Sequence, residues 1–450
     1  MAPVTSPSQS AVARSTLRKV TRRLMPFLFL LYLLNFLDRV NVGFAALQMN
    51  RDLGFGPEVY GLGAGIFFVA YAIFEVPSNL ILARTGARIW IARIMISWGL
   101  VASAMMFVSS AESFYALRLL LGVAEAGFFP GIIYYLTYWY PARERARAYS
   151  AFLAAIPLSG IVGSPISGAL LELDGVAGLA GWQWLFLLEG IPSAVVGVWV
   201  LSYLTDRPSA ARWLTPEESE WLERTLEAER SQMAEPHGAG VLRALRNPNV
   251  WHLALIYFLV VVGLYGFALW LPQLVNTIPG LSNLEIGVIT AIPYLVAAVG
   301  MVLVGARSDR TGERYLHMTI STLVGAAGFV LAAYLRSPVP LVVALAIVAF
   351  GALAPIGVFW SLPTAFLKGR AAAGGIAFIN SLGALGGFVG PYAVGLVRKR
   401  TGSFEAALLT LAGVMLASAV AALWLRARSR RWDELSPRAS ARETSGSIIP

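Results

Sequence analysis

The chain has 450 residues, of which 57% are hydrophobic and only 13% are charged, and its mean hydropathy is +0.67. A soluble protein carries about a quarter charged residues, so the composition predicts an all-α, polytopic membrane protein. The sequence has no cysteine and three histidines, which excludes disulfides and thiolate metal sites. We therefore expect no metal and no organic cofactor.

The net charge of +10 raises the question of a nucleic-acid partner. Most of the 35 Lys and Arg residues fall in segments that we place in the cytoplasm, as the positive-inside rule requires. Only residues 398–400 (Arg-Lys-Arg) break the pattern clearly, because they should lie outside. We expect a bacterial cytoplasmic-membrane protein, in contact with lipid and not with nucleic acid, with both termini cytoplasmic.

The first apolar run extends from about Leu24 to Leu47, after a Ser- and Arg-rich segment, 1–20, that is expected to be a disordered cytoplasmic tail. Each further run is long enough to cross a bilayer at about 20 residues. Together they predict about twelve transmembrane helices. The later runs are roughly 60–82, 87–108, 112–138, 147–171, 182–204, 251–275, 284–306, 315–336, 339–364, 371–396 and 404–426.

A polar segment divides these spans into two groups of six. We expect helix bundles at 21–204 and 251–428, a cytoplasmic linker at 205–250 and a disordered cytoplasmic tail at 429–450. In the linker, Thr215-Pro-Glu-Glu has the composition of a helix N-cap, which predicts a short amphipathic helix outside the membrane.

The two groups share one register. Residues 84–88 (Arg-Thr-Gly-Ala-Arg) and 310–314 (Arg-Thr-Gly-Glu-Arg) match at an offset of 226, and the same offset carries Pro165 onto Pro391 and Gly131 onto Gly357. Parallel repeats of this kind are typical of transporters that bind substrate between the halves, near the middle of the membrane.

Two opposite charges, Asp38 and Arg39, stand side by side in the first span. A charge at the centre of such a helix costs roughly 2.5–3.5 kcal/mol on insertion scales. One interpretation is a neutralised pair that only tolerates burial. The other is an acid that carries a proton beside a cation that holds an anion.

The fourth span offers a second pair of charges. Arg118, Gly122 and Glu125 are spaced i, i+4 and i+7 and so share one helix face. By helical rise, Asp38 and Arg39 lie at a depth between those of Arg118 and Glu125, so all four charges can converge on one cavity. Alternatively, Arg118 and Glu125 pair only to hold helices together.

Convergence predicts a proton-coupled anion site. Guanidinium groups match carboxylates with two hydrogen bonds, so Arg39 and Arg118 are the expected anion ligands. An entering anion is balanced if Asp38 or Glu125 takes up a proton, which makes anion and proton bind cooperatively. A monoanion needs at least one proton and a dianion needs two.

Other polar positions have more than one interpretation. Tyr71, Tyr265 and Asn380 are candidate substrate contacts, and interior packing explains each of them equally well. Glu75 and Arg93 are expected to form a structural ion pair, whereas Glu189 has no assigned partner.

The loops at 84–88 and 307–314 carry charges beside glycine at helix ends, which suits contacts that lock a cytoplasmic gate. The candidate gating residues are Arg84, Arg88, Asp309, Arg310 and Arg314.

Three stretches carry a resemblance to a known family: 35–43 (Asn-Phe-Leu-Asp-Arg-Val-Asn-Val-Gly), 118–131 (from Arg-Leu-Leu-Leu-Gly to Phe-Phe-Pro-Gly) and 305–314. Over about residues 20–430 the chain resembles the anion:cation symporters of the major facilitator superfamily, which include tartrate, phthalate, galactonate and 4-hydroxyphenylacetate permeases. Residues 74–79 (Phe-Glu-Val-Pro-Ser-Asn) look most like the tartrate and aromatic-acid branch.

The resemblance implies a major facilitator fold of two pseudo-symmetric six-helix halves. It implies proton coupling at Asp38 and Glu125, anion binding or its coupling at Arg39 and Arg118, and substrate near Tyr71 and Asn380. The family's acidic residue before Arg84 is Ala83 here, which puts the gate contact of the first half in doubt.

We therefore expect a monomeric proton-coupled symporter that imports a small organic anion by alternating access. An exporter or anion exchanger that uses the same site is the alternative. An enzyme is not expected, because no nucleophile or metal constellation is visible, and no soluble domain large enough for a receptor is present.

Overall fold

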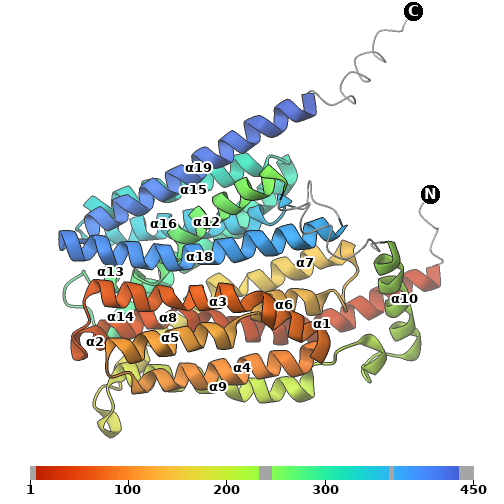
Figure 1. Ribbon diagram of the computed structural model, residues 1–450, viewed down its shortest axis with the longest axis horizontal. Helices are drawn as coiled ribbons and strands as arrows, with labels where there is room; N and C mark the ends of the chain where they lie inside the picture. The colour runs from red at the N-terminus through yellow and green to blue at the C-terminus, as the bar shows by residue number, and fades with distance from the viewer. Residues whose placement is uncertain (1–6, 233–245, 364–368, 435–450) are drawn as a thin grey trace, which may run out of the picture.

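The computed structural model describes residues 7–232, 246–363 and 369–434, and within these ranges the chain is helical without strands. Figure 1 shows the helices running mostly along the long axis of the molecule, with the N-terminal half below and the C-terminal half above. Within these ranges, twelve helical segments are long and apolar enough to cross a membrane, which confirms the predicted number of spans.

The N-terminal half contains nine α-helices because three of its six spans are interrupted. They are α1 (Pro7–Val40), α2 (Val42–Asp52), α3 (Pro57–Thr85), α4 (Ala87–Ala104), α5 (Ala111–Glu125), α6 (Phe128–Leu136), α7 (Ala142–Leu153), α8 (Ala155–Leu171) and α9 (Gly181–Tyr203).

The linker helix α10 (Pro216–Gln232) is followed by the C-terminal half. Its helices are α12 (Pro248–Ala268), α13 (Leu271–Val275), α14 (Asn283–Thr311), α15 (Arg314–Tyr334), α16 (Pro338–Phe359), α18 (Gly369–Thr401) and α19 (Phe404–Glu434).

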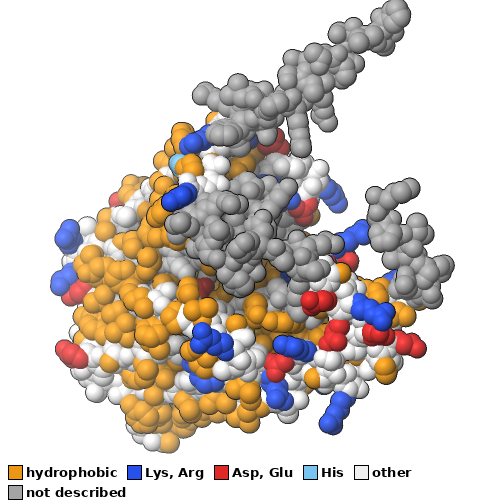
Figure 2. All heavy atoms as spheres, turned by 45° about the vertical axis from the view of Figure 1, so that its right-hand side comes forward, with side chains coloured by type: hydrophobic (Ala, Val, Ile, Leu, Met, Phe, Trp, Pro, Cys, Tyr) orange, Lys and Arg blue, Asp and Glu red, His pale blue; other side chains and the backbone are white. Residues whose placement is uncertain are grey.

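Large apolar side chains cover the outside of the bundle, as a lipid-facing surface requires. Figure 2 shows a broad expanse of hydrophobic side chains on one face. Val302 and Val339 are at least 70% exposed, and Leu80 and Ile73 are at least 60% exposed, and all four lie on membrane spans. The apolar residues therefore cover the outer surface of the bundle as well as fill its core.

The structure differs from the sequence prediction at both ends. Helix α1 begins at Pro7, so residues 7–20 are helical and not a disordered tail, and α19 continues to Glu434. Residues 1–6 and 435–450 lie outside the described residues. The early start of α1 lets Lys19 and Ser15 hydrogen-bond Glu218 of α10 at 2.8 and 2.7 Å.

The contact with Lys19 and Ser15 keeps the carboxyl group of Glu218 ionised, in the linker that we place outside the membrane. Burial by itself raises the pKa of a carboxyl group, but the hydrogen bonds from Lys19, Ser15 and the Thr215 backbone outweigh burial and lower the pKa of Glu218 to about 2. A helix is therefore present where the linker helix was predicted, and Glu218 anchors it to α1.

The fourth span is broken where its charge lies. Helix α5 ends at Glu125, and Gly127 adopts the left-handed conformation with φ 86° before α6 begins. A Cβ atom there would stand 2.4 Å from Ser78 Oγ, so glycine is required for backbone and packing alike. The interruption of the first span is milder, since Asn41 keeps helical angles.

The two halves meet through equivalent pairs of helices, α3 with α18 and α8 with α14. Figure 1 shows α3 and α18 lying along each other at the middle of the molecule. A Cβ atom on Gly61 would lie 3.1 Å from Gly395 Cα, and one on Gly287 would lie 3.2 Å from Gly168 Cα. Gly61 and Gly287 differ by the predicted offset of 226, so the repeat seen in the sequence recurs in the packing.

These close contacts lie at the predicted outer end and hold it shut. Tyr60 donates to the Leu269 carbonyl at 2.5 Å, and Lys399 pairs with Glu58 at 2.7 Å across the halves. Arg398 donates to Gln273 at 3.1 Å. Of the three basic residues that break the positive-inside pattern, Lys399 therefore joins the two halves at this end, and Arg398 joins α18 to α13 within the C-terminal half.

Enlarging Gly61 should force this end open. A Cβ atom at Gly61 would lie 2.7 Å from the Pro391 carbonyl oxygen, and overpacking costs about 1–3 kcal/mol. The reporter is a cysteine introduced at Ala384, in the wall of the central cavity, and the reagent is a membrane-impermeant maleimide added outside. We expect Gly61→Val to raise the labelling rate of this cysteine by about tenfold.

The absence of native cysteines makes that single reporter unambiguous. Gly413→Val on α19 is the matched control, because nothing lies within 4 Å of a Cβ atom there. Equal labelling of the Gly61→Val variant and the control would show that the glycine contact does not set the closed state.

Candidate substrate site

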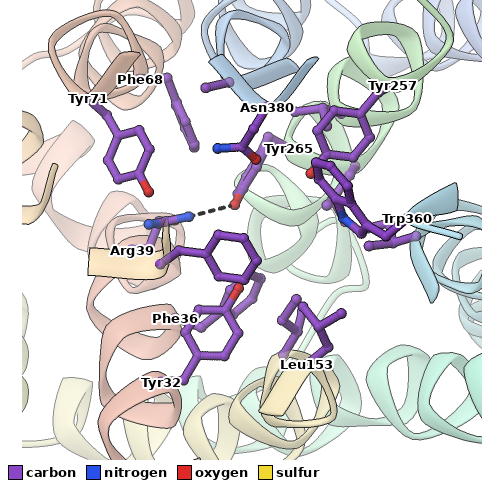
Figure 3. A pocket seen from close by; sticks show the side chains of 16 residues that line it. Tyr32, Phe36, Arg39, Phe68, Tyr71, Leu153, Tyr257, Tyr265, Trp360 and Asn380 are labelled. Atoms are coloured by element: carbon purple, nitrogen blue, oxygen red, sulfur yellow. Dashed lines mark hydrogen bonds between the residues drawn. The ribbon is translucent and has the colours of Figure 1, made fainter. Parts of the chain in front are cut away.

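A cavity of about 70 Å³ lies between the halves, and both halves contribute to its wall. Ligand pockets are typically several hundred Å³, so the cavity is contracted in this conformation. Figure 3 shows polar groups from α1, α3, α12 and α18 turned toward one another inside an aromatic wall. The wall includes Tyr32, Phe36, Arg39, Phe68, Tyr71, Tyr257, Tyr265, Trp360 and Asn380.

Arg39 is the cationic group of this cavity. Its Nε donates to Glu125 Oε1 at 3.0 Å, and its Nη2 forms an ion pair with the same oxygen. Its Nη1 donates to the Tyr265 hydroxyl at 3.1 Å, across the halves. The guanidinium therefore joins the predicted proton carrier, the cavity and the C-terminal half.

Glu125 is completely buried, and its second oxygen has no hydrogen-bond partner among the described residues. A buried carboxylate is costly unless it is paired, and Arg39 supplies the pair. If an anion took Arg39, Glu125 would lose its counter-charge, and protonation would become the favoured way to keep it buried.

Asp38 faces away from the cavity, into the N-terminal half. Its Oδ2 accepts from Trp98 Nε1 at 2.8 Å and from Ser193 Oγ at 2.5 Å, and its Oδ1 has no partner among the described residues. Asp38 nevertheless interacts electrostatically with Glu125. The two acids are thus neighbours that do not share the cavity wall.

The structure does not bring Arg118, the second predicted anion ligand, to the cavity. Its Nε and Nη2 donate to the carbonyl oxygens of Gly63 and Ala64 at 3.1 and 2.9 Å, and its guanidinium packs over the Phe67 ring at 5.0 Å. These donors are occupied by the α3 backbone, so Arg118 does not line the cavity. In this structure it fastens α5 to α3.

This geometry predicts a stability effect at Arg118. Lysine cannot reach two carbonyls with a fixed fork, and a hydrogen bond from a charged donor contributes about 1.5–3 kcal/mol. We expect Arg118→Lys to lower the free energy of unfolding by about that amount, read by thermal unfolding in detergent. A large loss of anion affinity at unchanged stability would instead restore Arg118 as a direct ligand.

The structure brings the other predicted contacts to the cavity. Tyr71, Tyr265 and Asn380 line it, and the Arg39 guanidinium lies 5.2 Å from the centre of the Tyr71 ring. Arg39 and Tyr265 are separated by 226 residues, so equivalent positions of the two halves touch each other. Their roles in binding stay predictions.

The predicted pair of Glu75 and Arg93 is wrong. Asn380 Nδ2 donates to Glu75 Oε1 at 2.5 Å and Ser381 Oγ donates to Oε2 at 3.4 Å, both from the other half. Arg93 packs over the Trp90 ring at 4.1 Å and donates to the Ala124 carbonyl. The sequence could place both residues at one depth but could not show which helix face each occupies.

Glu189, which had no assigned partner, accepts a hydrogen bond from Ser167 at 2.6 Å. It is buried and its second oxygen has no partner among the described residues. It also interacts electrostatically with Asp38. A second, enclosed group of acids therefore lies inside the N-terminal half, behind the cavity.

The gating candidates lie at the other end of the bundle from the closed contact. Arg88 contacts Asp206, through its backbone N–H at 2.8 Å, and Arg314 donates to the Ser361 carbonyl at 3.0 Å. Arg84, Asp309 and Arg310 are exposed. Within the described residues none of the five joins the two halves, and their gating role stays a prediction.

Several residues of the site were missed by sequence reasoning. Tyr32 and Phe36 line the cavity with Arg39, and their spacing of i, i+4 and i+7 was the signal that could have found them. No local pattern indicates Trp98 or Ser193, because their contact with Asp38 joins helices far apart in sequence.

Comparison with known proteins agrees with this architecture. A family model described as Major Facilitator Superfamily matches residues 28–391. A putative tartrate transporter of Agrobacterium vitis is 54% identical over 409 residues, 91% of each chain. A quinolone resistance transporter of Acinetobacter baumannii is 43% identical and covers 90% of this chain and 93% of its own.

The fold also matches a crystal structure of a bacterial homologue of the human lysosomal transporter Spinster. That structure has a TM-score of 0.71 at 20% identity, over 92% of this chain and 98% of the other. The twelve candidate spans among the described residues, the family model and the named relatives together indicate a multi-pass membrane transporter, and members of this family are not enzymes. The chain belongs to the Major Facilitator Superfamily.

Proposed function

We propose that the protein is a proton-coupled symporter that imports a small organic anion, of the tartrate-like dicarboxylate, sugar-acid or aromatic-acid kind, across the bacterial cytoplasmic membrane. The observation that carries this proposal is the Arg39–Glu125 pair at the wall of the central cavity. A carboxylate that reaches Arg39 competes with Glu125, so anion binding favours protonation of Glu125. The relatives named as tartrate transporters support a carboxylate substrate.

In this proposal Arg39, Tyr71, Tyr265 and Asn380 bind the anion, because all four line the cavity. Glu125 and Asp38 carry the proton as a coupled pair. Since the two carboxylates interact, protonation of one favours ionisation of the other, so the pair takes up one proton at a time.

Alternating access would then follow from the two-half construction. The outer end is closed here by glycine contacts and by the Glu58–Lys399 pair. We propose that the loops with Arg84, Arg88, Asp309, Arg310 and Arg314 close the cytoplasmic end in the opposite state. Both termini are proposed to be cytoplasmic, and the unit to be a monomer with protons as its only coupling ion.

An exporter or anion exchanger is the second candidate, favoured by the relative named for quinolone resistance. Both candidates use the same cavity, and they differ in whether a proton enters with the substrate.

Purified protein in liposomes separates them. An inward pH gradient should drive tartrate or a related acid to accumulate, and the outer medium should become more alkaline in step with uptake. Uptake that ignores the pH gradient but needs a counter-anion inside would identify an exchanger. A screen of organic acids by thermal shift would choose the substrate for the assay.

A further inference from the structure

Glu75 is a buried acid that the mechanism above does not use. It lies on α3, four residues after Tyr71 and on the same helix face, and it is only 4% exposed. Asn380, which lines the cavity, donates directly to Glu75 at 2.5 Å. Glu75 therefore lies directly behind Asn380, one side chain away from the cavity.

The surroundings of Glu75 contain no cation of its own. Its two oxygens accept from Asn380 and Ser381 of α18, and it forms no ion pair within the described part of the chain. The titratable and charged groups that act on it are Arg39 from α1, Tyr71 from α3 and Tyr257 from α12. Of these only Arg39 is positive, and Arg39 is already paired with Glu125.

An anion bound in the cavity would neutralise Arg39, the only positive charge that acts on Glu75. A carboxylate held by Arg39 adds negative charge beside Tyr71 and Asn380, and a second carboxylate on the same molecule adds more. Negative charge near a buried acid favours its protonated form. Binding of an anion there should therefore place a proton on Glu75.

The charges of the cavity set the number of protons. With Arg39, Glu125 and Glu75 ionised, the empty site carries one net negative charge. A dicarboxylate brings two more, and protonation of both acids returns the site to its starting charge. The two protons on these acids thus match a doubly charged substrate.

We propose that Glu75 is a further proton-coupling residue: the Asp38–Glu125 pair takes up one proton and Glu75 takes up the other. The protein is then a transporter of dicarboxylates with two protons for each dianion. Because the hydrogen bonds to Glu75 come from α18, its protonation also alters a contact between the halves. This inference rests on the proposed function, since it assigns the substrate charge and the proton number of that same symport.

The test uses purified full-length protein in liposomes with tartrate as the probe, an inward pH gradient and a potential set by potassium and valinomycin. Two protons with a dianion carry no net charge, so accumulation by the wild type should not depend on the membrane potential. Glu75→Gln should carry one net negative charge inward. An inside-negative potential of about 100 mV, about 2.3 kcal/mol per charge, should then lower its accumulation about 50-fold.

Glu112→Gln is the matched control, because Glu112 is an exposed acid of α5, and it should behave as wild type. Proton uptake on adding tartrate to detergent-solubilised protein gives a second readout that needs binding but no turnover. It should fall by about half in Glu75→Gln. Glu75→Asp keeps a titratable group and should restore the wild-type number of protons.

The outcomes separate the two proposals. If wild-type uptake follows the pH gradient and Glu75→Gln ignores the potential with an unchanged proton number, Glu75 is not a coupling residue and only this inference fails. If wild-type uptake ignores the pH gradient, the proposed symport itself is overturned and this inference falls with it.

Discussion

Arg39→Lys should reduce the apparent affinity for the transported anion by about 10- to 100-fold. The arginine donates from three nitrogens, to Glu125, Tyr265 and, at 3.5 Å, Asn35. Lysine keeps the charge but offers a point donor in place of the planar fork. Loss of one hydrogen bond from a charged group costs about 1.5–3 kcal/mol, and 1.4 kcal/mol is tenfold in affinity.

Concentration-dependent uptake in liposomes measures this effect. Arg336→Lys is the control, because Arg336 is exposed and pairs with Glu405 on the surface. Thermal unfolding of both variants separates a binding defect from a folding defect. An unchanged half-saturating concentration for Arg39→Lys would argue against direct contact between Arg39 and the anion.

Glu125→Gln should weaken the accumulation driven by a pH gradient, because one of the two coupled protons is lost, while leaving exchange of labelled for unlabelled anion. The amide has nearly the same shape but cannot take up a proton. One unit of pH gradient supplies about 1.4 kcal/mol for each coupled proton. Losing one coupled proton should therefore lower the ratio of inside to outside anion about tenfold for each unit of pH gradient.

The same substitution makes a second, independent prediction about stability. It leaves Arg39 buried without its counter-charge, and breaking a buried pair costs about 3–5 kcal/mol. We therefore expect a lower unfolding temperature in the empty variant and an unusually large stabilisation by the anion, which supplies the missing charge. Accumulation that depends on the pH gradient as steeply as in the wild type would show that Glu125 carries no coupled proton.

The fold could be predicted from the sequence because the bilayer imposes it. Length, hydropathy and the positive-inside pattern define twelve spans, and the offset of 226 predicts the two halves whose glycines meet at Gly61 and Gly287. The start of α1 was misjudged, because its first turns are polar and are held by Glu218, a residue far along the chain.

The site could be predicted in part. Depth follows from helical rise, which predicted that Asp38, Arg39, Arg118 and Glu125 lie inside the membrane bundle, and all four side chains are buried in the structure. Rotation about the helix axis does not follow from depth. Asp38 faces Trp98 and Arg118 faces the α3 backbone, and only contacts between helices decide such directions. The bond between Glu75 and Asn380 belongs to the same class, because it joins residues from opposite halves.

The contact between Arg39 and Tyr265 has a consequence for how substrates are told apart. The halves share one frame, yet at this equivalent pair of positions one holds a guanidinium and the other a phenol. In the proposed function the N-terminal half therefore supplies the charge that binds the anion, while Tyr257, Trp360 and Asn380 of the C-terminal half shape the remaining wall. We therefore expect relatives with different substrates to differ in the aromatic side chains of α12 and of the segment next to α16. The proton-coupling residues of the N-terminal half would stay the same.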